Sequence, residues 1–193
     1  GIYGMATLEG ERAIRRHPDH VIIRPGWLFG RKKRGLIKSW IRIVKRDAGN
    51  VVASRRRFSP TYTGDLAAAI LAIAKQVDCD ANVWGTYHYS SLETKRENEF
   101  VRQVIKYAAN HDSGIYQLLD SISVSETEVR APEILNSTLS SKKIFDTFGI
   151  KQKSWHGQLQ KVIKLLYEGR PRAKDFDSGV KSNEIDEAEI LIE

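Results

Sequence analysis

The chain has 193 residues, of which 41% are hydrophobic and 28% charged, and its formal net charge is +7. This length and composition predict one globular domain with a sizeable core, or one domain followed by a tail. The single cysteine, Cys79, excludes a disulfide framework, and no Cys/His cluster has the spacing of a zinc site. The apolar runs are too short to span a bilayer and no signal peptide is recognisable, so we expect a cytoplasmic protein without a membrane anchor.

The positive charge is unevenly distributed. Residues 171–193 carry a net −4 and the rest of the chain +11, so we expect an acidic, disordered tail. The excess of Lys and Arg lies largely in the runs RKKR (31–34) and RRR (55–57). Such runs are either solvated loop charges or a site for an anionic small molecule such as a diphosphate. Nucleic-acid binding is disfavoured, because no recognised module or interleaved aromatic residues accompany them.

Helices and strands alternate along the chain. Periodicity predicts helices over 4–16, 36–46, 65–76, 97–110, from Ser140 or Ser141 to Gly149, and over 154–169. Short β-branched or alternating runs predict strands at 21–24, 51–53, 85–91 and near 121–125. In the first helix, Leu8, Ala13 and Ile14 are available to pack inward. The alternation indicates an α/β protein, but the clear strands are too few for a complete doubly wound sheet.

Several segments together resemble the extended short-chain dehydrogenases. They are YGMATLEGE (3–11), VIIRPGWLFG (21–30), FSPTYTGDLAAAI (58–70), GTYHYS (85–90) and RAPEILNSTLSSKKIFDTFGI (130–150). Their order and spacing are similar to those of the branch typified by dTDP-4-dehydrorhamnose reductase and its sugar-nucleotide-binding relatives. The resemblance implies that residues 1–170 are the C-terminal part of a Rossmann-like domain, an incomplete parallel sheet plus a small α/β substrate-binding lobe, with 171–193 as the tail.

The same resemblance implies that part of the fold lies elsewhere. In this family a Gly-rich turn after the first strand brings the backbone close to the cofactor pyrophosphate at a helix N-terminus. These residues contain no such turn, and the match begins at the family's catalytic tyrosine. We therefore expect the cofactor-binding half to lie outside the 193 residues.

The family's chemistry implied by the resemblance is NAD(P)H-dependent reduction of a nucleotide-sugar ketone. A tyrosine donates the proton to the new alkoxide, and a lysine four residues later lowers the tyrosine's pKa from about 10 and binds the nicotinamide ribose. Tyr3 matches the tyrosine, but Thr7 stands in the place of the lysine. Threonine can hydrogen-bond a ribose hydroxyl but brings no positive charge. Taken alone, Tyr3 is also consistent with a half-buried aromatic residue at a helix start.

Further site residues follow from the same match. Pro25 and Gly26 fall in the loop that runs beside the nicotinamide, where proline fixes φ and glycine allows close approach of the backbone. Trp27 either lies against a hexose face or is a core residue.

The anionic nucleotide-sugar is assigned to three further residues, Arg57, Arg130 and Asn136. Relatives commonly have Arg-Pro where this chain has Glu133-Ile134, and glutamate at that position would repel a phosphate.

Two functions are consistent with these residues. In the first, the full-length protein reduces a nucleotide-sugar with NAD(P)H, while the 193 residues alone neither turn over nor bind the cofactor tightly. In the second, the chain is a non-catalytic relative that binds a nucleotide-sugar or serves as a regulatory or scaffolding subunit; Thr7 and Glu133 favour it. No metal is implied, and a homodimer is left open.

Overall fold

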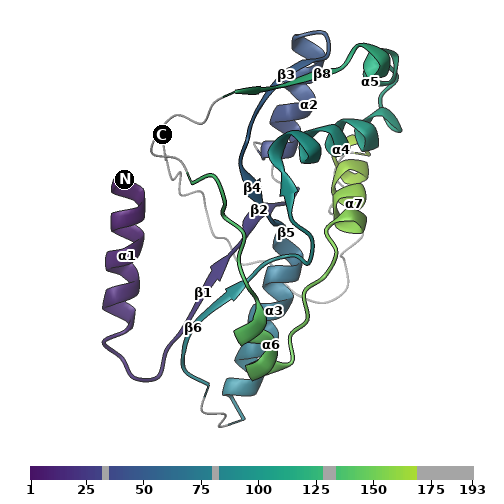
Figure 1. Ribbon diagram of the computed structural model, residues 1–193. Coiled ribbons are helices and arrows are strands. Elements are labelled where there is room, and N and C mark those ends of the chain that lie inside the picture. The colour runs from purple at the N-terminus through teal and green to yellow at the C-terminus, as the bar shows by residue number, and fades with distance from the viewer. Residues whose placement is uncertain (32–34, 80–82, 128–133, 169–193) are drawn as a thin grey trace, which may run out of the picture.

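The computed structural model describes residues 1–31, 35–79, 83–127 and 134–168, and Figure 1 shows their arrangement. The predictions for Arg130, Glu133, most of the RKKR run and the tail at 171–193 lie outside these residues. In chain order the elements are α1 (Ile2–Ile14), β1 (Val21–Pro25), β2 (Trp27–Phe29), α2 (Leu36–Arg46), β3 (Asn50–Ser54), β4 (Arg57–Phe58), β5 (Pro60–Tyr62), α3 (Thr63–Val77), β6 (Gly85–Tyr89), β7 (Lys95–Arg96), α4 (Glu97–Ala109), α5 (Ser113–Leu118), a 3-10 turn (Leu119–Ser121), β8 (Ser123–Thr127), α6 (Lys142–Phe148) and α7 (His156–Tyr167). The predicted α/β class is confirmed.

The described strands pair in twos. Parallel pairs form between β1 and β6, β2 and β5, and β3 and β8, whereas β4 and β7 are antiparallel. In Figure 1 the β1–β6 pair lies in the lower part of the molecule with α3 and α6, and β3–β8 lies in the upper part with α2 and α4. The parallel pairs are joined by helical crossovers, as parallel strands require.

Two hydrophobic cores correspond to these two parts. The larger is centred on Phe100 of α4, which is fully buried and whose ring contacts those of Trp40, Phe58 and Trp155. The smaller packs α3 and α6 against β6, where Tyr87 lies edge-on to Phe148. Trp155 is therefore a core residue.

Helix ends agree with the sequence in some places and differ in others. α6 begins after Ser141 and ends at Gly149, whose φ of 66° is the left-handed conformation that glycine adopts readily at a helix C-terminus. The helix predicted over 65–76 begins earlier, at Thr63, and its N-cap is Tyr62, which makes no side-chain cap hydrogen bond. The carboxylate of Asp65 pairs with Lys153 at 3.3 Å.

The prediction that α1 packs inward through apolar side chains is also wrong. Ile14 is 52% exposed, and Leu8 and Ala13 are exposed as well. Figure 1 shows α1 standing beside β1 at the edge of the molecule. Within the described ranges, every helix is too short or too polar to cross a membrane.

Candidate functional site

Tyr3 and Thr7 lie one turn apart on α1. The Thr7 hydroxyl donates a hydrogen bond to the Tyr3 carbonyl oxygen at 2.9 Å, a back-bond typical of threonine inside a helix. The Tyr3 side chain is 84% exposed, so the interpretation of Tyr3 as a half-buried aromatic residue is wrong. Both side chains are exposed to solvent on this face of α1.

Pro25 and Gly26 form the end of β1 and its continuation. Gly26 is buried, and its N–H donates to the Tyr89 carbonyl at 2.8 Å, which extends the β1–β6 ladder by one residue. A Cβ atom at Gly26 would lie 2.5 Å from the Thr61 hydroxyl and 2.9 Å from Ser90 Cβ. Glycine is required here because the neighbouring backbone and side chains leave no space for a methyl group.

Replacing Gly26 with alanine is expected to lower the free energy of unfolding by about 1–3 kcal/mol, as overpacking of a tight site does. The measurement is the denaturant midpoint at an unchanged m-value. Gly157→Ala is the matched control, because nothing lies within 4 Å of a Cβ there and the residue is helical. Equal stability of Gly26→Ala and the unsubstituted chain would contradict the close packing of this loop.

Trp27 belongs largely to the core. Its ring lies 4.4 Å from that of Phe58 and 5.7 Å from that of Trp40, measured between centroids. The side chain is half-buried against the larger core, which favours the structural interpretation of the two that the sequence left open. A contact between Trp27 and a hexose stays a prediction.

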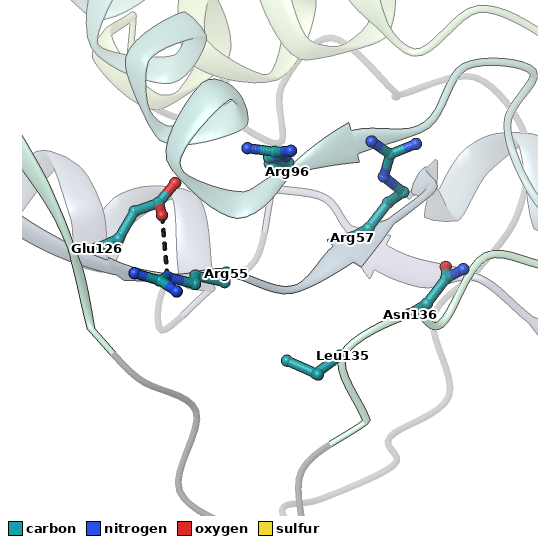
Figure 2. A pocket seen from close by; sticks show the side chains of 6 residues that line it. All are labelled: Arg55, Arg57, Arg96, Glu126, Leu135 and Asn136. Atoms are coloured by element: carbon teal, nitrogen blue, oxygen red, sulfur yellow. Dashed lines mark ion pairs between the residues drawn. The ribbon is translucent and has the colours of Figure 1, made fainter.

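A pocket of about 410 Å³ lies where β4, β7, the end of β8 and the segment 135–136 meet (Figure 2). Six residues line it: Arg55, Arg57, Arg96, Glu126, Leu135 and Asn136. Two of them, Arg57 and Asn136, were assigned to the anionic ligand from the sequence. The structure brings these two together.

The backbone fixes the positions of these side chains. Arg57 and Arg96 are register partners on the β4–β7 ladder, so their side chains share one face. The segment after residue 134 lies against β4 as a parallel bridge between Arg57 and Asn136, in which the Arg57 N–H donates to Leu135 O at 2.7 Å. The Asn136 Oδ1 accepts from the Thr138 hydroxyl at 2.8 Å, which orients the amide.

The pocket carries an excess of positive charge. Arg55 Nε pairs with Glu126 Oε2 at 3.2 Å, and Glu126 also accepts from Asn98 Nδ2 at 2.6 Å. Within the described residues, neither Arg57 nor Arg96 has a carboxylate within ion-pair distance. Facing like charges on paired strands repel each other, and an anion bound between them removes that repulsion. Guanidinium groups match the geometry of phosphate oxygens, so the pocket is suited to a phosphorylated ligand.

The two groups of candidate residues are separate in the structure. Across the described residues, no hydrogen bond or ion pair joins α1, which carries Tyr3 and Thr7, to the arginine pocket. Sequence reasoning missed Arg96, Glu126 and Leu135 as pocket residues and Arg130 lies outside the described part. The pairing of Arg96 with Arg57 could not be predicted from the sequence, because β4 and β7 have two residues each and are too short to show a periodic pattern. No group of metal-ligating side chains occurs among the residues described.

Similar solved structures define the class of the fold as that of Rossmann-like reductases and epimerases. A dTDP-4-dehydrorhamnose reductase of Clostridium acetobutylicum matches with a TM-score of 0.68 and 22% identity, over 85% of this chain and 55% of that one. The reductase of Bacillus anthracis in complex with NADP matches with a TM-score of 0.66 and 23% identity, with the same coverage. A UDP-galactose 4-epimerase matches with a TM-score of 0.62 and 17% identity, over 85% of this chain and 52% of that one.

The sequence identifies the family within this class. The chain belongs to the RmlD substrate binding domain family, whose model matches residues 1–168. The dTDP-4-dehydrorhamnose reductase of Sinorhizobium fredii is 29% identical over 88% of this chain and 58% of its own length. Methionine adenosyltransferase 2 subunit beta of Danio rerio is 31% identical over 51% of this chain and 32% of its own length. The resemblance stated from the sequence is confirmed, and the chain spans a little over half the length of the first of these relatives.

Proposed function

We propose that this chain is the substrate-binding part of an NAD(P)H-dependent reductase of a nucleotide-sugar ketone, and that the arginine pocket holds the ligand's diphosphate. The observation that carries the proposal is the pair Arg57 and Arg96, two guanidinium groups on facing positions without described carboxylate partners. Family membership and the reductases among the relatives support the class of substrate.

Within this proposal each side chain has a defined task. Arg57 and Arg96 bind phosphate oxygens, and the Asn136 amide donates a further hydrogen bond. Tyr3 gives its phenolic proton to the oxygen of the reduced carbonyl, because its hydroxyl lies on an exposed helix face that a substrate can reach. NAD(P)H would supply the hydride when bound.

The residues assigned to the cofactor fit it only in part. The Thr7 hydroxyl is already donated to Tyr3 O, so it remains available as an acceptor for a ribose hydroxyl. The space around Gly26 is filled by Thr61 and Ser90, so this glycine serves the packing of the chain itself. We therefore propose that tight cofactor binding depends on residues outside the 193.

The 193 residues alone are expected to bind a dTDP-sugar without oxidising NADPH. Binding is measured by calorimetry at several salt concentrations, because an arginine-based site weakens as salt screens it. Turnover is measured by NADPH absorbance with a dTDP-4-keto-sugar, with the Sinorhizobium fredii reductase as the positive control. NADPH oxidation by the 193 residues would overturn the expectation of an inactive fragment, and absence of nucleotide-sugar binding would overturn the proposed ligand.

One observation favours a second function, that of a non-catalytic subunit. Thr7 lies in the place where the family's reaction needs a lysine, and it brings no positive charge to Tyr3, because its hydroxyl only donates its proton to the backbone of its own helix. One relative in the same comparison is named as the beta subunit of methionine adenosyltransferase 2. Activity of a Thr7→Lys variant distinguishes the two functions.

A further inference from the structure

The attachment of α1 to the rest of the molecule depends on one charged residue. Glu11 is the only residue of α1 that is buried, with 9% of its surface exposed. The large apolar side chains of the helix point into solvent, as Ile2 at 89% and Met5 at 69% exposure show. Hydrophobic packing therefore contributes little to holding this helix against the sheet.

Glu11 makes a two-point ion pair with Arg24 of β1. Arg24 Nε donates to Oε1 at 2.7 Å and Nη2 to Oε2 at 2.6 Å, the fork geometry that fixes both distance and orientation. Arg15, one turn further along α1, donates to Oε2 at 3.1 Å and to the Thr86 hydroxyl of β6 at 3.2 Å. The carboxylate is thus the point at which α1, β1 and β6 are connected.

The place of this ion pair links it to the candidate catalytic residues. Tyr3, Thr7 and Glu11 follow one another at intervals of four residues, so they form one stripe along α1. Arg24 directly precedes Pro25 and Gly26 in the chain. A contact that fixes Glu11 on Arg24 therefore fixes the stripe that carries Tyr3 relative to this loop.

We propose that Glu11 is a positioning residue, which fixes the orientation of Tyr3 relative to Pro25 and Gly26 through its two-point ion pair with Arg24. The geometric part of this proposal stands by itself. Its consequence for reduction rests on the proposed function, in which Tyr3 is the proton donor.

The charges around Glu11 make the attachment depend on pH. The hydrogen bond from Arg24 outweighs burial and lowers the pKa of the Glu11 carboxyl below the usual range of a glutamate. Burial lowers the pKa of His88, the register partner of Arg24 on β6; Arg24 and Lys143 of α6 lower it further, whereas Glu11 raises it. A depressed carboxylate pKa contributes stability above the unfolded pKa that is lost as pH falls through the folded value. Because protonated His88 is attracted to Glu11, we expect the loss of the attachment of α1 in acid to follow the protonation of Glu11.

The test measures the position of residue 3 directly. In a Cys79→Ser background, Tyr3→Cys and Leu92→Cys carry spin labels; both side chains are exposed, and Leu92 follows the Ser90–Ser91 segment that contacts Gly26. Pulsed electron resonance at neutral pH should give one narrow distance distribution. Glu11→Gln should abolish the narrow peak. The matched control Glu9→Gln changes an exposed carboxylate that pairs with Arg12 of the same helix, and it should preserve the peak.

Two further measurements separate positioning from a general loss of structure. Arg24→Lys keeps the positive charge but cannot form the two-point contact with Glu11. Its distance distribution should therefore be broader than that of the unsubstituted chain and narrower than that of Glu11→Gln. The unsubstituted chain should lose its narrow peak reversibly as pH falls through the lowered pKa of Glu11, while circular dichroism reports whether the fold persists. A narrow peak that survives both Glu11→Gln and acid overturns the proposal. If Glu11→Gln does not fold, the distance distributions of Arg24→Lys and of the unsubstituted chain at low pH decide whether Glu11 positions Tyr3.

Nucleotide-sugar binding by the same variants keeps the two proposals distinguishable. Glu11→Gln should leave affinity for a dTDP-sugar unchanged, because the arginine pocket has no described contact with α1. If no variant binds the ligand, the proposed function fails while the distance measurements still decide the role of Glu11.

Discussion

Replacing Arg57 and Arg96 together with alanine is expected to weaken binding of a nucleoside diphosphate such as dTDP by about 10²–10⁴-fold. A hydrogen bond to a charged group contributes about 1.5–3 kcal/mol, and about 1.4 kcal/mol corresponds to a tenfold change in affinity. Each arginine alone should therefore account for about 10- to 100-fold. Isothermal titration calorimetry at constant ionic strength measures the change, since screening by salt acts on the same interaction.

The controls for this experiment use the geometry of the β4–β7 ladder. Arg42→Ala removes an exposed arginine of α2 outside the pocket and should leave affinity unchanged. Arg96→Gln should weaken binding and at the same time raise the free energy of unfolding by about 0.2–1 kcal/mol, because it removes a facing like charge from the pair. Affinity that is unaffected by loss of both arginines would contradict the proposed ligand site.

Replacing Thr7 with lysine in the full-length protein is expected to raise the rate of nucleotide-sugar reduction by about 10²–10⁴-fold, the range over which general acid–base catalysis contributes. Residue 7 lies one turn from Tyr3 and is exposed, so a lysine there can place its ammonium group beside the phenol without displacing core side chains. Lysine also has a higher helix propensity than threonine, so α1 should not be destabilised. The rate is followed by NADPH absorbance with a dTDP-4-keto-sugar.

Thr7→Ala is the matched control, since it removes the hydroxyl without adding a charge. It should leave the rate low and the fold intact, because the lost hydrogen bond is made to the carbonyl of the same helix. A lysine variant that remains as inactive as the alanine variant, while still binding the nucleotide-sugar, would favour the non-catalytic subunit.

The sequence predicts well those parts of this molecule that depend on local pattern. The helices α2, α4 and α7 and the strands β1 and β6 carry enough apolar periodicity to be located from the residues alone. The helix end at Gly149 follows from the preference of glycine for the left-handed conformation. The basic run RRR pointed to Arg57 and a family motif to Asn136, and the structure brings these two residues into one pocket.

The remainder depends on long-range pairing that a local pattern does not contain. Arg96 joins the pocket only because a two-residue strand pairs with β4, 39 positions earlier in register. The burial of Glu11 was missed because a glutamate within an amphipathic helix is normally expected to face solvent. Arg24, a charged residue at the end of the apolar run VIIR, was the available signal that β1 needs an acidic partner.

The tryptophans packed near the arginine pocket provide an intrinsic fluorescence signal close to the candidate ligand site. Phe58 follows Arg57 in the chain, and its ring lies against that of Trp27, which in turn contacts Trp40. Trp155 belongs to the same core, so this core contains three of the four tryptophans of the chain. Because Phe58 directly follows Arg57, we expect binding of a ligand to Arg57 to change the surroundings of Trp27, and intrinsic fluorescence would report that change without any added label.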